Sequence, residues 1–358
     1  MRRQRVGRWL LWLSDPGGPR RPLPDAPLRA DEPRLLLQCA EAHRVLPAVT
    51  SNLRLVASRH GVRRVLAVPG RSDGRQALAS ALAEADGQLQ RRKVLSVLIG
   101  RQTEELAEAF AAHDLPAVLL KGADFADRLY PATGLRYHRD VDVLTEPAAL
   151  GSAARLMQAM GYVPEELPFT RRHADWQESV WRHRGGQGAL VEVHGDLVHS
   201  PALRRRTSVG LKDLDLEAAP TGGPLPCRPT PASLLLVAAV HAAVSHTFGR
   251  LRPLCDVLQA ARGAAGPVDA GRLAEMAART GSGRAVATSL RLARAAFGEG
   301  RCAALNAELE QRGMPRGRAA LAPPSMWLPL VAPSVVAQPE AAGPRVAREM
   351  LRRLSAWV

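Results

Sequence analysis

The sequence predicts an α+β protein in which a small mixed sheet lies between two helical regions. Aromatic residues make up only 4% of the chain, so Leu, Val and Ala must fill the core, a composition that favours helices over a large β-sandwich. Several short segments with the pattern of β-strands interrupt the helical periodicity near the middle of the chain. The length of 358 residues is sufficient for roughly two or three domains with a sizeable core.

The first third of the chain is expected to be a leader followed by helices. Six prolines between residues 15 and 33 predict that 1–33 is a proline-rich, flexible and extended leader. Apolar residues then recur every three or four positions in 34–60 and 76–113. We therefore expect a helical N-terminal domain over 34–114, with its first helical run broken at Pro47.

Short strands predict a sheet-containing core over 115–219. Its apolar runs are short, and several alternate with polar residues, as half-buried strands do. The expected elements are a strand at 117–120, a Lys121-Gly122 turn, a helix at 123–130, a strand at 140–144, a helix at 147–160, and a hairpin of 176–183 with 189–197.

Helical periodicity returns after a linker at 220–231 that is rich in Pro and Gly. It predicts a helical C-terminal domain over 232–318. The final segment, 319–358, is expected to be a proline-rich tail with an amphipathic terminal helix at 345–357. The helices expected in the C-terminal domain are 232–246, 251–262, 270–279 and 284–297.

The net charge of +15 favours anionic ligands such as nucleotides and phosphates. Nucleic acid is not the expected partner, because no stretch interleaves aromatic with basic residues as single-strand binders do. The four cysteines form no CxxC pair, so neither a zinc site nor a disulfide framework is indicated. With neither a convincing export signal nor an apolar run of about 18 residues, we expect a cytoplasmic protein that does not enter a membrane.

The strongest chemical signal is Asp140-Val141-Asp142 on an expected strand. Residues two apart on a strand project from the same face, so the two carboxylates lie close together and repel each other unless a cation binds between them. Oxygen ligands of this kind suit Mg²⁺, which proteins hold with one or two carboxylates together with substrate phosphates. The alternative interpretation is a polar edge strand that faces solvent.

A second alternating stretch, Glu192-Val193-His194, places a further carboxylate and an imidazole on one face of a strand. Glu192 could complete a metal site, although Asp196 competes for that role if the strand continues past Gly195. His194 is either a functional residue or a hydrogen-bonded structural histidine. The Lys121-Gly122 turn precedes a helix, and there a glycine lets the backbone approach a phosphate.

The segment AVLLKGADFADRLYPATGLRYHRDVDVLTEP, followed by ALVEVH, resembles the DNA polymerase β-like nucleotidyltransferase superfamily. Within it, the chain is most similar to the uncharacterised family-5 nucleotidyltransferases, over roughly residues 34 to 265. This chain departs from the superfamily pattern at Ala123, where Ser or Gly is usual, and at Glu192, where relatives often have Asp. The residues that carry the resemblance are Lys121-Gly122, Tyr130-Pro131, Arg136, Asp140/Asp142 and Glu192/His194.

The resemblance implies a nucleotidyltransferase core of mixed β-sheet with Mg²⁺ or Mn²⁺ as cofactor. It implies transfer of a nucleoside monophosphate from an NTP, with ATP expected first, to a hydroxyl group of a small molecule or protein. Phosphoryl transfer at the same site and a catalytically inactive nucleotide- or protein-binding module are the alternatives. The implied catalytic and metal-binding residues are Asp140, Asp142 and Glu192, the nucleotide-binding residues Lys121, Gly122 and Arg136, and the candidate acceptor-site residues His194, His241 and His246.

Overall fold

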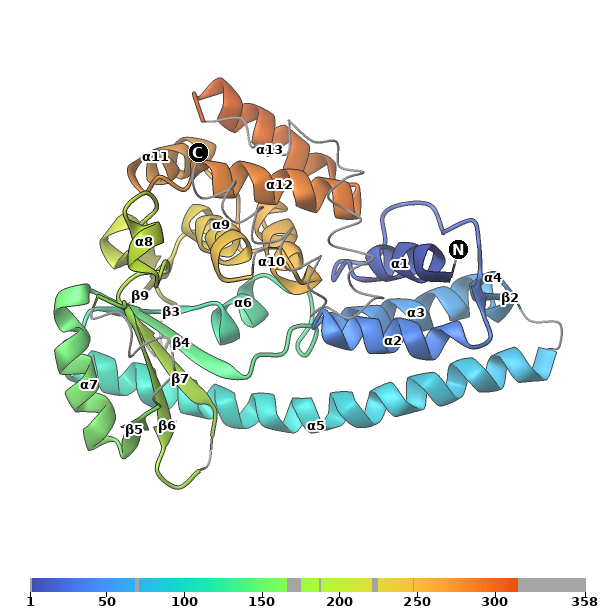
Figure 1. Cartoon of the computed structure of the whole chain (residues 1–358), viewed down its shortest axis with the longest axis horizontal. Helices are drawn as coiled ribbons and strands as arrows, with labels where there is room; N and C mark the ends of the chain where they lie inside the picture. Colours follow the sequence, from blue (N-terminus) through green and yellow to red (C-terminus); the bar gives the residue numbers. More distant parts are fainter. Residues whose placement is uncertain are drawn as a thin grey trace.

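The computed structural model describes residues 2–67, 71–165, 175–186, 188–220, 225–246 and 248–314 (Figure 1). It confirms the α+β fold, because a five-stranded mixed sheet is combined with many helices. The proline-rich tail at 319–358 and its expected terminal helix lie outside the described residues. In the part of the chain that is described, no helix is both long and apolar enough to cross a membrane.

The sheet has the strand order β3-β4-β7-β6-β5, and all its strands except β5 lie where the sequence pattern predicts them. Only β4 and β7 are parallel, whereas the other neighbours in the sheet are antiparallel. The expected hairpin forms from β6 and β7. The five strands are β3 (Ala117–Leu120), β4 (Asp140–Thr145), β5 (Tyr162–Pro164), β6 (Glu178–His183) and β7 (Leu190–His194).

Helices α5 (Arg71–Ala112) and α7 (Leu150–Ala159) pack against the sheet (Figure 1). Valines at alternate positions of β4 and β7, such as Val141 and Val191, are buried with Phe110 of α5 in one hydrophobic cluster. Because successive side chains of a strand point to opposite faces, the polar residues between these valines face away from α5.

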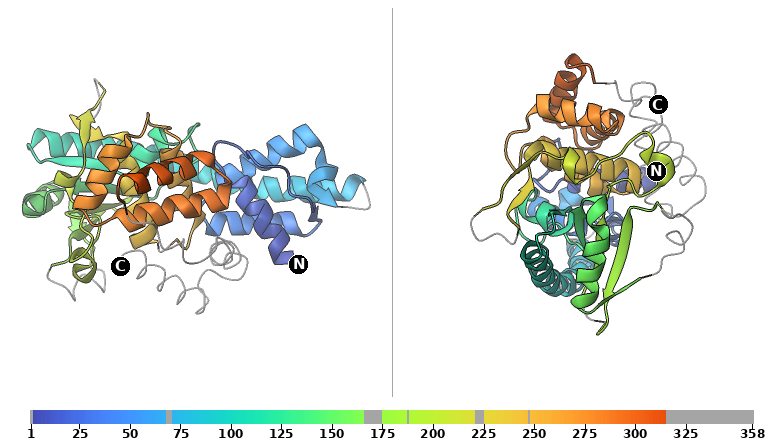
Figure 2. Two further views of the ribbon diagram at one scale, coloured as in Figure 1. Left: turned by 90° about the horizontal axis from the view of Figure 1, so that it is seen from above. Right: turned by 90° about the vertical axis from the view of Figure 1, so that its left-hand side faces the viewer.

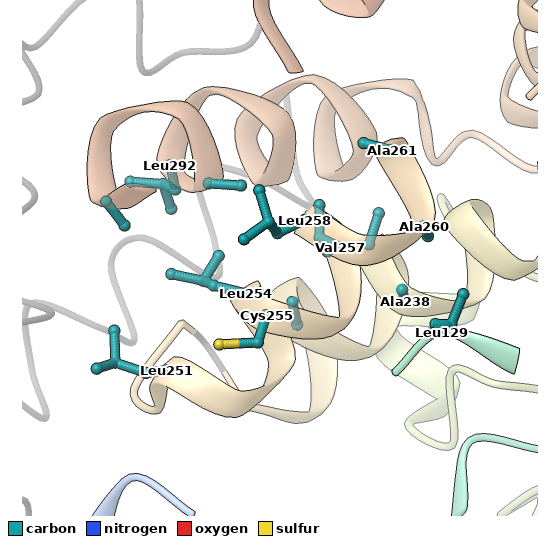
Figure 3. Packing of buried hydrophobic residues seen from close by; sticks show 14 of the residues in the cluster. Leu129, Ala238, Leu251, Leu254, Cys255, Val257, Leu258, Ala260, Ala261 and Leu292 are labelled. Carbon is teal, nitrogen blue, oxygen red and sulfur yellow. The ribbon is translucent and has the colours of Figure 1, made fainter. Parts of the chain in front are cut away.

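The C-terminal helices form a layered bundle in which α10 packs against both α9 and α12. Figure 3 shows Leu254 and Leu258 of α10 on the side of that helix that faces Leu292 of α12. Between α9 and α10 the chain makes a short π-helical turn, His241–Ser245. The helices are α9 (Pro231–Val240), α10 (Leu251–Ala261), α11 (Ala270–Arg279), α12 (Gly283–Phe297) and α13 (Gly300–Gln311).

Along the long axis of the molecule, the C-terminal helices lie between the sheet at one end and the N-terminal helices at the other (Figure 2). A single hydrophobic cluster joins these two groups of helices. The helical regions that precede and follow the sheet in the sequence therefore share one hydrophobic core. The expected domain boundaries stay a prediction. The N-terminal helices and the helix beside the sheet are α2 (Glu32–Ala42), α3 (Leu46–His60) and α6 (Gly122–Arg128).

Short elements complete the fold. The expected linker at 220–231 contains β9, which pairs with β8 in an antiparallel two-stranded sheet, so its described part is not simply an irregular connection. Pro47 lies in the first turn of α3, where its missing N–H costs no helical hydrogen bond. The short elements are β1 (Leu28–Arg29), α4 (Val62–Val65), β2 (Leu66–Ala67), α8 (Pro201–Arg204), β8 (Leu216–Ala218) and β9 (Cys227–Pro229).

The structure differs from the flexible leader expected over 1–33. Residues Arg2–Leu13 form α1, whose apolar side chains recur at three- and four-residue spacing and enter the core that includes α2 and α3. The proline-containing stretch that follows is fastened by side chains: the Trp9 indole donates to the Ala26 carbonyl, and Arg262 of α10's C-terminal end pairs with Asp15 at 2.6 Å. The helical spacing of the apolar residues in α1 therefore determines the structure of this segment, and the prolines that follow do not prevent the helix.

Replacing Trp9 by Ala should lower the free energy of unfolding by about 3–5 kcal/mol, because the indole is fully buried and its removal leaves a cavity. Chemical denaturation followed by circular dichroism measures the change. Arg8→Ala, at an exposed position of the same helix, is the matched control and should change stability by less than about 0.5 kcal/mol. Equal stability of the Trp9→Ala variant and the unmodified protein would contradict the packing of α1.

Candidate functional site

The two aspartates of β4 project from the face of the sheet opposite to α5. Asp142 is 5% exposed, whereas Asp140, at the start of the strand, is only partly buried. Between and after them, Val141 and Val143 point into the core beneath the sheet. The pattern of polar and apolar residues therefore sets the direction of both carboxylates, as predicted from the sequence.

Glu192 lies next to Asp142 because β4 and β7 pair in parallel with these two residues in register. Ligand atoms of Asp142, Glu192 and His194 all lie within 4.8 Å of one another. The structure thus brings Asp142 together with two residues that lie 50 and 52 positions further along the chain. Asp196, the alternative third carboxylate, is turned away from this group, since its oxygens accept from Ser208 and from the Val198 and Val209 amides.

Asp142 is the most heavily paired carboxylate of the group. The Lys121 Nζ lies 2.8 Å from its Oδ1, and the His194 Nε2 lies 3.1 Å from the same atom. Burial opposes ionisation of Asp142, but the Lys121 charge and the hydrogen bond from His194 hold its pKa well below the usual value. Burial by itself would lower the pKa of Lys121, yet the surrounding carboxylates keep it raised, so the ion pair is charged at neutral pH.

Glu192 has no comparable partner. Its pKa is raised, first because the carboxyl is buried and second because the negative charge of Asp142 is close. Asp140 adds a further repulsive charge. A divalent cation would relieve this excess of negative charge, and carboxylate oxygens are the ligands that Mg²⁺ prefers, so Asp140, Asp142 and Glu192 fit such an ion.

The turn between β3 and α6 has an unusual backbone at Lys121, not at the glycine that the sequence suggests. Lys121 has φ 45° and ψ −118°, a conformation that favours glycine. Such a conformation costs of the order of 1–3 kcal/mol, and the buried ion pair to Asp142 helps to hold it. Gly122 follows as the first residue of α6 and lies against the Asp140 carbonyl, where an added Cβ would come within 3.4 Å.

Arg136 is committed to protein partners. Its guanidinium makes a bidentate pair with Asp256, at 2.8 Å and 3.0 Å, and its third nitrogen donates to the Gly122 carbonyl at 2.8 Å. Tyr130 donates to the same Asp256 carboxylate at 2.7 Å. The side chain borders the cavity described below and also supports the Lys121-Gly122 turn, so a contact of Arg136 with a phosphate stays a prediction.

His241 and His246 lie at either end of the π-helical turn, with ring centroids 4.5 Å apart. Burial, and then nearby positive charges, lower the pKa of both rings well below the usual value, so both are neutral. The His241 Nδ1 has no hydrogen-bond partner among the described residues. Inserted π-turns are frequent at functional sites, and this one directs two imidazoles towards the sheet.

All the predicted site residues except His194 border one cavity of about 410 Å³ between the sheet and the C-terminal helices: Lys121, Gly122, Arg136, Asp140, Asp142, Glu192, His241 and His246. Sequence reasoning missed several other residues that line it. Arg44 and Arg252 bring positive charge from the helical side, and Trp176, Glu178 and His199 form another wall. Nothing local in the sequence marks the two arginines, since this chain contains 49 basic residues and these two meet only through the fold.

Arg252 is nearly inaccessible and incompletely paired. Burial, together with the charge of Arg136, lowers the pKa of Arg252 to about 10. One of its terminal nitrogens donates to the Tyr137 carbonyl, whereas its Nε has no hydrogen-bond partner in the described part of the chain. Burial and the charge of Arg250 likewise lower the pKa of Arg44. An anion in the cavity would satisfy both guanidinium groups.

Comparison with known families matches residues 29–298 to the uncharacterised nucleotidyltransferases. The chain belongs to this family. The match confirms the resemblance drawn from the Lys121-Gly122 turn and the Asp140/Asp142 pair, and it includes the whole sheet and the helices from α2 to α12. A search of curated proteins gave no match to the chain.

Replacing Asp256 by Ala should lower the free energy of unfolding of the protein by about 3–5 kcal/mol, because the buried Arg136 charge loses its partner. Urea denaturation provides the measurement. As a matched control, Asp86→Ala breaks an exposed ion pair with Arg54 and should cost less than about 1 kcal/mol. A loss as small as that of the control would argue against the supporting role of Arg136.

Proposed function

We propose that the protein transfers a nucleoside monophosphate from an NTP, with ATP the first candidate, to a hydroxyl-bearing acceptor. The observation that carries this proposal is one cavity with Asp140, Asp142 and Glu192 on the sheet side and Arg44 and Arg252 on the helical side. A metal-bound triphosphate needs both sets of residues, because carboxylates bind the cation and guanidinium groups bind the phosphate oxygens. Membership of the nucleotidyltransferase family adds independent support.

Asp140, Asp142 and Glu192 would hold Mg²⁺, which supplies charge stabilisation for the attacking and leaving oxygens of an in-line displacement. Lys121 already carries a positive charge beside Asp142 and is in place to neutralise a phosphate oxygen. The buried Arg252 and the neighbouring Arg44 bind and orient the polyphosphate. Arg136 acts indirectly by fixing the turn that carries Lys121.

The neutral rings of His241 and His246 are suited to contact with the acceptor. A neutral imidazole can accept a hydrogen bond from a hydroxyl group, and the unpartnered Nδ1 of His241 is buried at the cavity wall. His194 does not border the cavity, so its part is to orient Asp142 through the Nε2 contact. The acceptor side of the cavity therefore consists of the two π-turn histidines.

Calorimetric titration with ATP, GTP, CTP and UTP, with and without Mg²⁺, tests the proposal. Asp140→Asn is the preferred variant, because Asp140 is partly exposed and its replacement leaves the buried Lys121–Asp142 pair intact. We expect Mg²⁺-dependent binding that is weakened by at least about tenfold in this variant. The matched control Asp127→Asn, an exposed carboxylate of α6, should bind like the unmodified protein.

Equal nucleotide binding by Asp140→Asn and Asp127→Asn, or no binding by the unmodified protein, would contradict the proposed site. With a bound NTP in hand, mass analysis of the acceptor product separates an added nucleotide from an added phosphate. An added phosphate would favour the phosphoryl-transfer alternative, since the two reactions differ in the phosphorus that is attacked.

Arg44→Gln should weaken ATP binding by about 10- to 100-fold, because charge-assisted hydrogen bonds to phosphate are worth about 1.5–3 kcal/mol. The same change should have little effect on binding of adenosine, which lacks phosphates. Parallel calorimetric titrations with ATP and adenosine measure the difference. A similar loss for both ligands would show that Arg44 acts through the shape of the cavity and not through its charge.

A further inference from the structure

A second group of metal-ligand residues lies on the other side of His194 from Asp142. Glu178 of β6 lies near the Nδ1 of the His194 ring, and His199, five residues after His194, lies against the face of that ring. The Glu178 Oε1 is 3.8 Å from the His194 Nδ1, and the Glu178 Oε2 is 3.0 Å from the His199 Nδ1. The two imidazoles are stacked with their centroids 4.9 Å apart, and ligand atoms of all three residues lie within 4.8 Å of one another.

The tautomer of His194 makes this arrangement unusual. A carboxylate oxygen accepts in such a contact, so the His194 Nε2 carries the proton that is directed at the Asp142 Oδ1, 3.1 Å away. With that proton on Nε2, a neutral ring has its lone pair on Nδ1. That atom is buried without a hydrogen-bond partner among the described residues.

The lone pair is directed at another negative group. Glu178 pairs through its Oε2 with His199, whose Nδ1 lies 3.0 Å away, and its Oε1 lies on the side of His194. A buried lone pair facing a carboxylate at 3.8 Å is unfavourable unless a cation lies between them. A proton on Nδ1 is the other way to resolve the contact, and the experiment below separates the two.

We propose that Glu178, His194 and His199 bind a divalent transition-metal ion such as Zn²⁺, at a site distinct from that of Asp140, Asp142 and Glu192. Two imidazoles and one carboxylate select such ions over Mg²⁺, which prefers oxygen ligands. The Nε2 contact of His194 with Asp142 supplies the second-sphere carboxylate that metal-bound histidines usually have. Glu178 and His199 both border the cavity, so the ion keeps an open coordination position there.

The proposal does not depend on nucleotidyl transfer, because it concerns binding of the ion alone. Co²⁺ is the probe, since its visible absorption reports imidazole ligation and a low coordination number. Untagged full-length protein is titrated with Co²⁺ in the presence of a large excess of Mg²⁺. We expect one Co²⁺ per chain, displaced by Zn²⁺ and not by Mg²⁺.

Three variants assign the site. His199→Ala and Glu178→Gln should each weaken Co²⁺ binding by at least about 10- to 100-fold, the loss that removal of even a second-sphere partner causes. Asp140→Asn alters only the acidic site and should bind Co²⁺ at least as tightly as the unmodified protein. Circular dichroism establishes folding, and His199→Gln replaces His199→Ala if the latter does not fold.

Several results would overturn the proposal: no Co²⁺ binding by the unmodified protein, displacement by Mg²⁺, or equal affinity in the His199 and Asp140 variants. If the unmodified protein binds no Co²⁺, a proton on the His194 Nδ1, and not a cation, explains its contact with Glu178. ATP titration of the unmodified protein with Mg²⁺ keeps the two hypotheses apart, because nucleotide binding by a protein that binds no Co²⁺ supports only the proposed function. Co²⁺ binding without nucleotide binding supports only the metal site.

Discussion

The buried ion pair between Arg136 and Asp256 is the interaction on which the geometry of the cavity depends. It joins the loop before β4 to α10, two parts of the chain separated by 120 residues. The same guanidinium donates to the Gly122 carbonyl, and the same carboxylate accepts from Tyr130. Both charged side chains are almost fully buried, so neither partner can be removed without leaving an unpaired charge in the core.

This pairing fixes the distance between the sheet and the helices that close the cavity. Lys121, one residue before Gly122, has a strained backbone, and such a conformation persists only where its surroundings define it. Arg136 holds one side of the turn and the Asp142 carboxylate holds the Lys121 side chain. The Lys121 ammonium is thus positioned by two buried ion pairs. It forms one of them itself, with Asp142, and the other is the pair between Arg136 and Asp256.

The sequence predicts the acidic face well because strand periodicity is a local property. Alternation of Asp140 and Asp142 with valines determines which side chains share a face, whatever the partner strand is. The register of Asp142 with Glu192 could not be derived in this way, since parallel strands are joined by long connections that no turn constrains. The role of Arg136 was also out of reach, because its partner Asp256 belongs to a distant helix.

His194 links the acidic site of Asp140, Asp142 and Glu192 to the proposed site of Glu178 and His199. Its Nε2 lies near Asp142 and its Nδ1 near Glu178. A cation at Nδ1 would hold the proton on Nε2 and thereby strengthen the hydrogen bond to Asp142. A more strongly hydrogen-bonded Asp142 has less negative charge to offer a cation beside Glu192, so each ion would weaken the other. Such coupling is reciprocal, because the change in affinity is the same whichever ion binds first. Carboxylates thus alternate with cationic or hydrogen-bond-donating groups along the row Lys121, Asp142, His194 and Glu178. A change of charge at one of these groups therefore alters the charge at its neighbours and in the cavity.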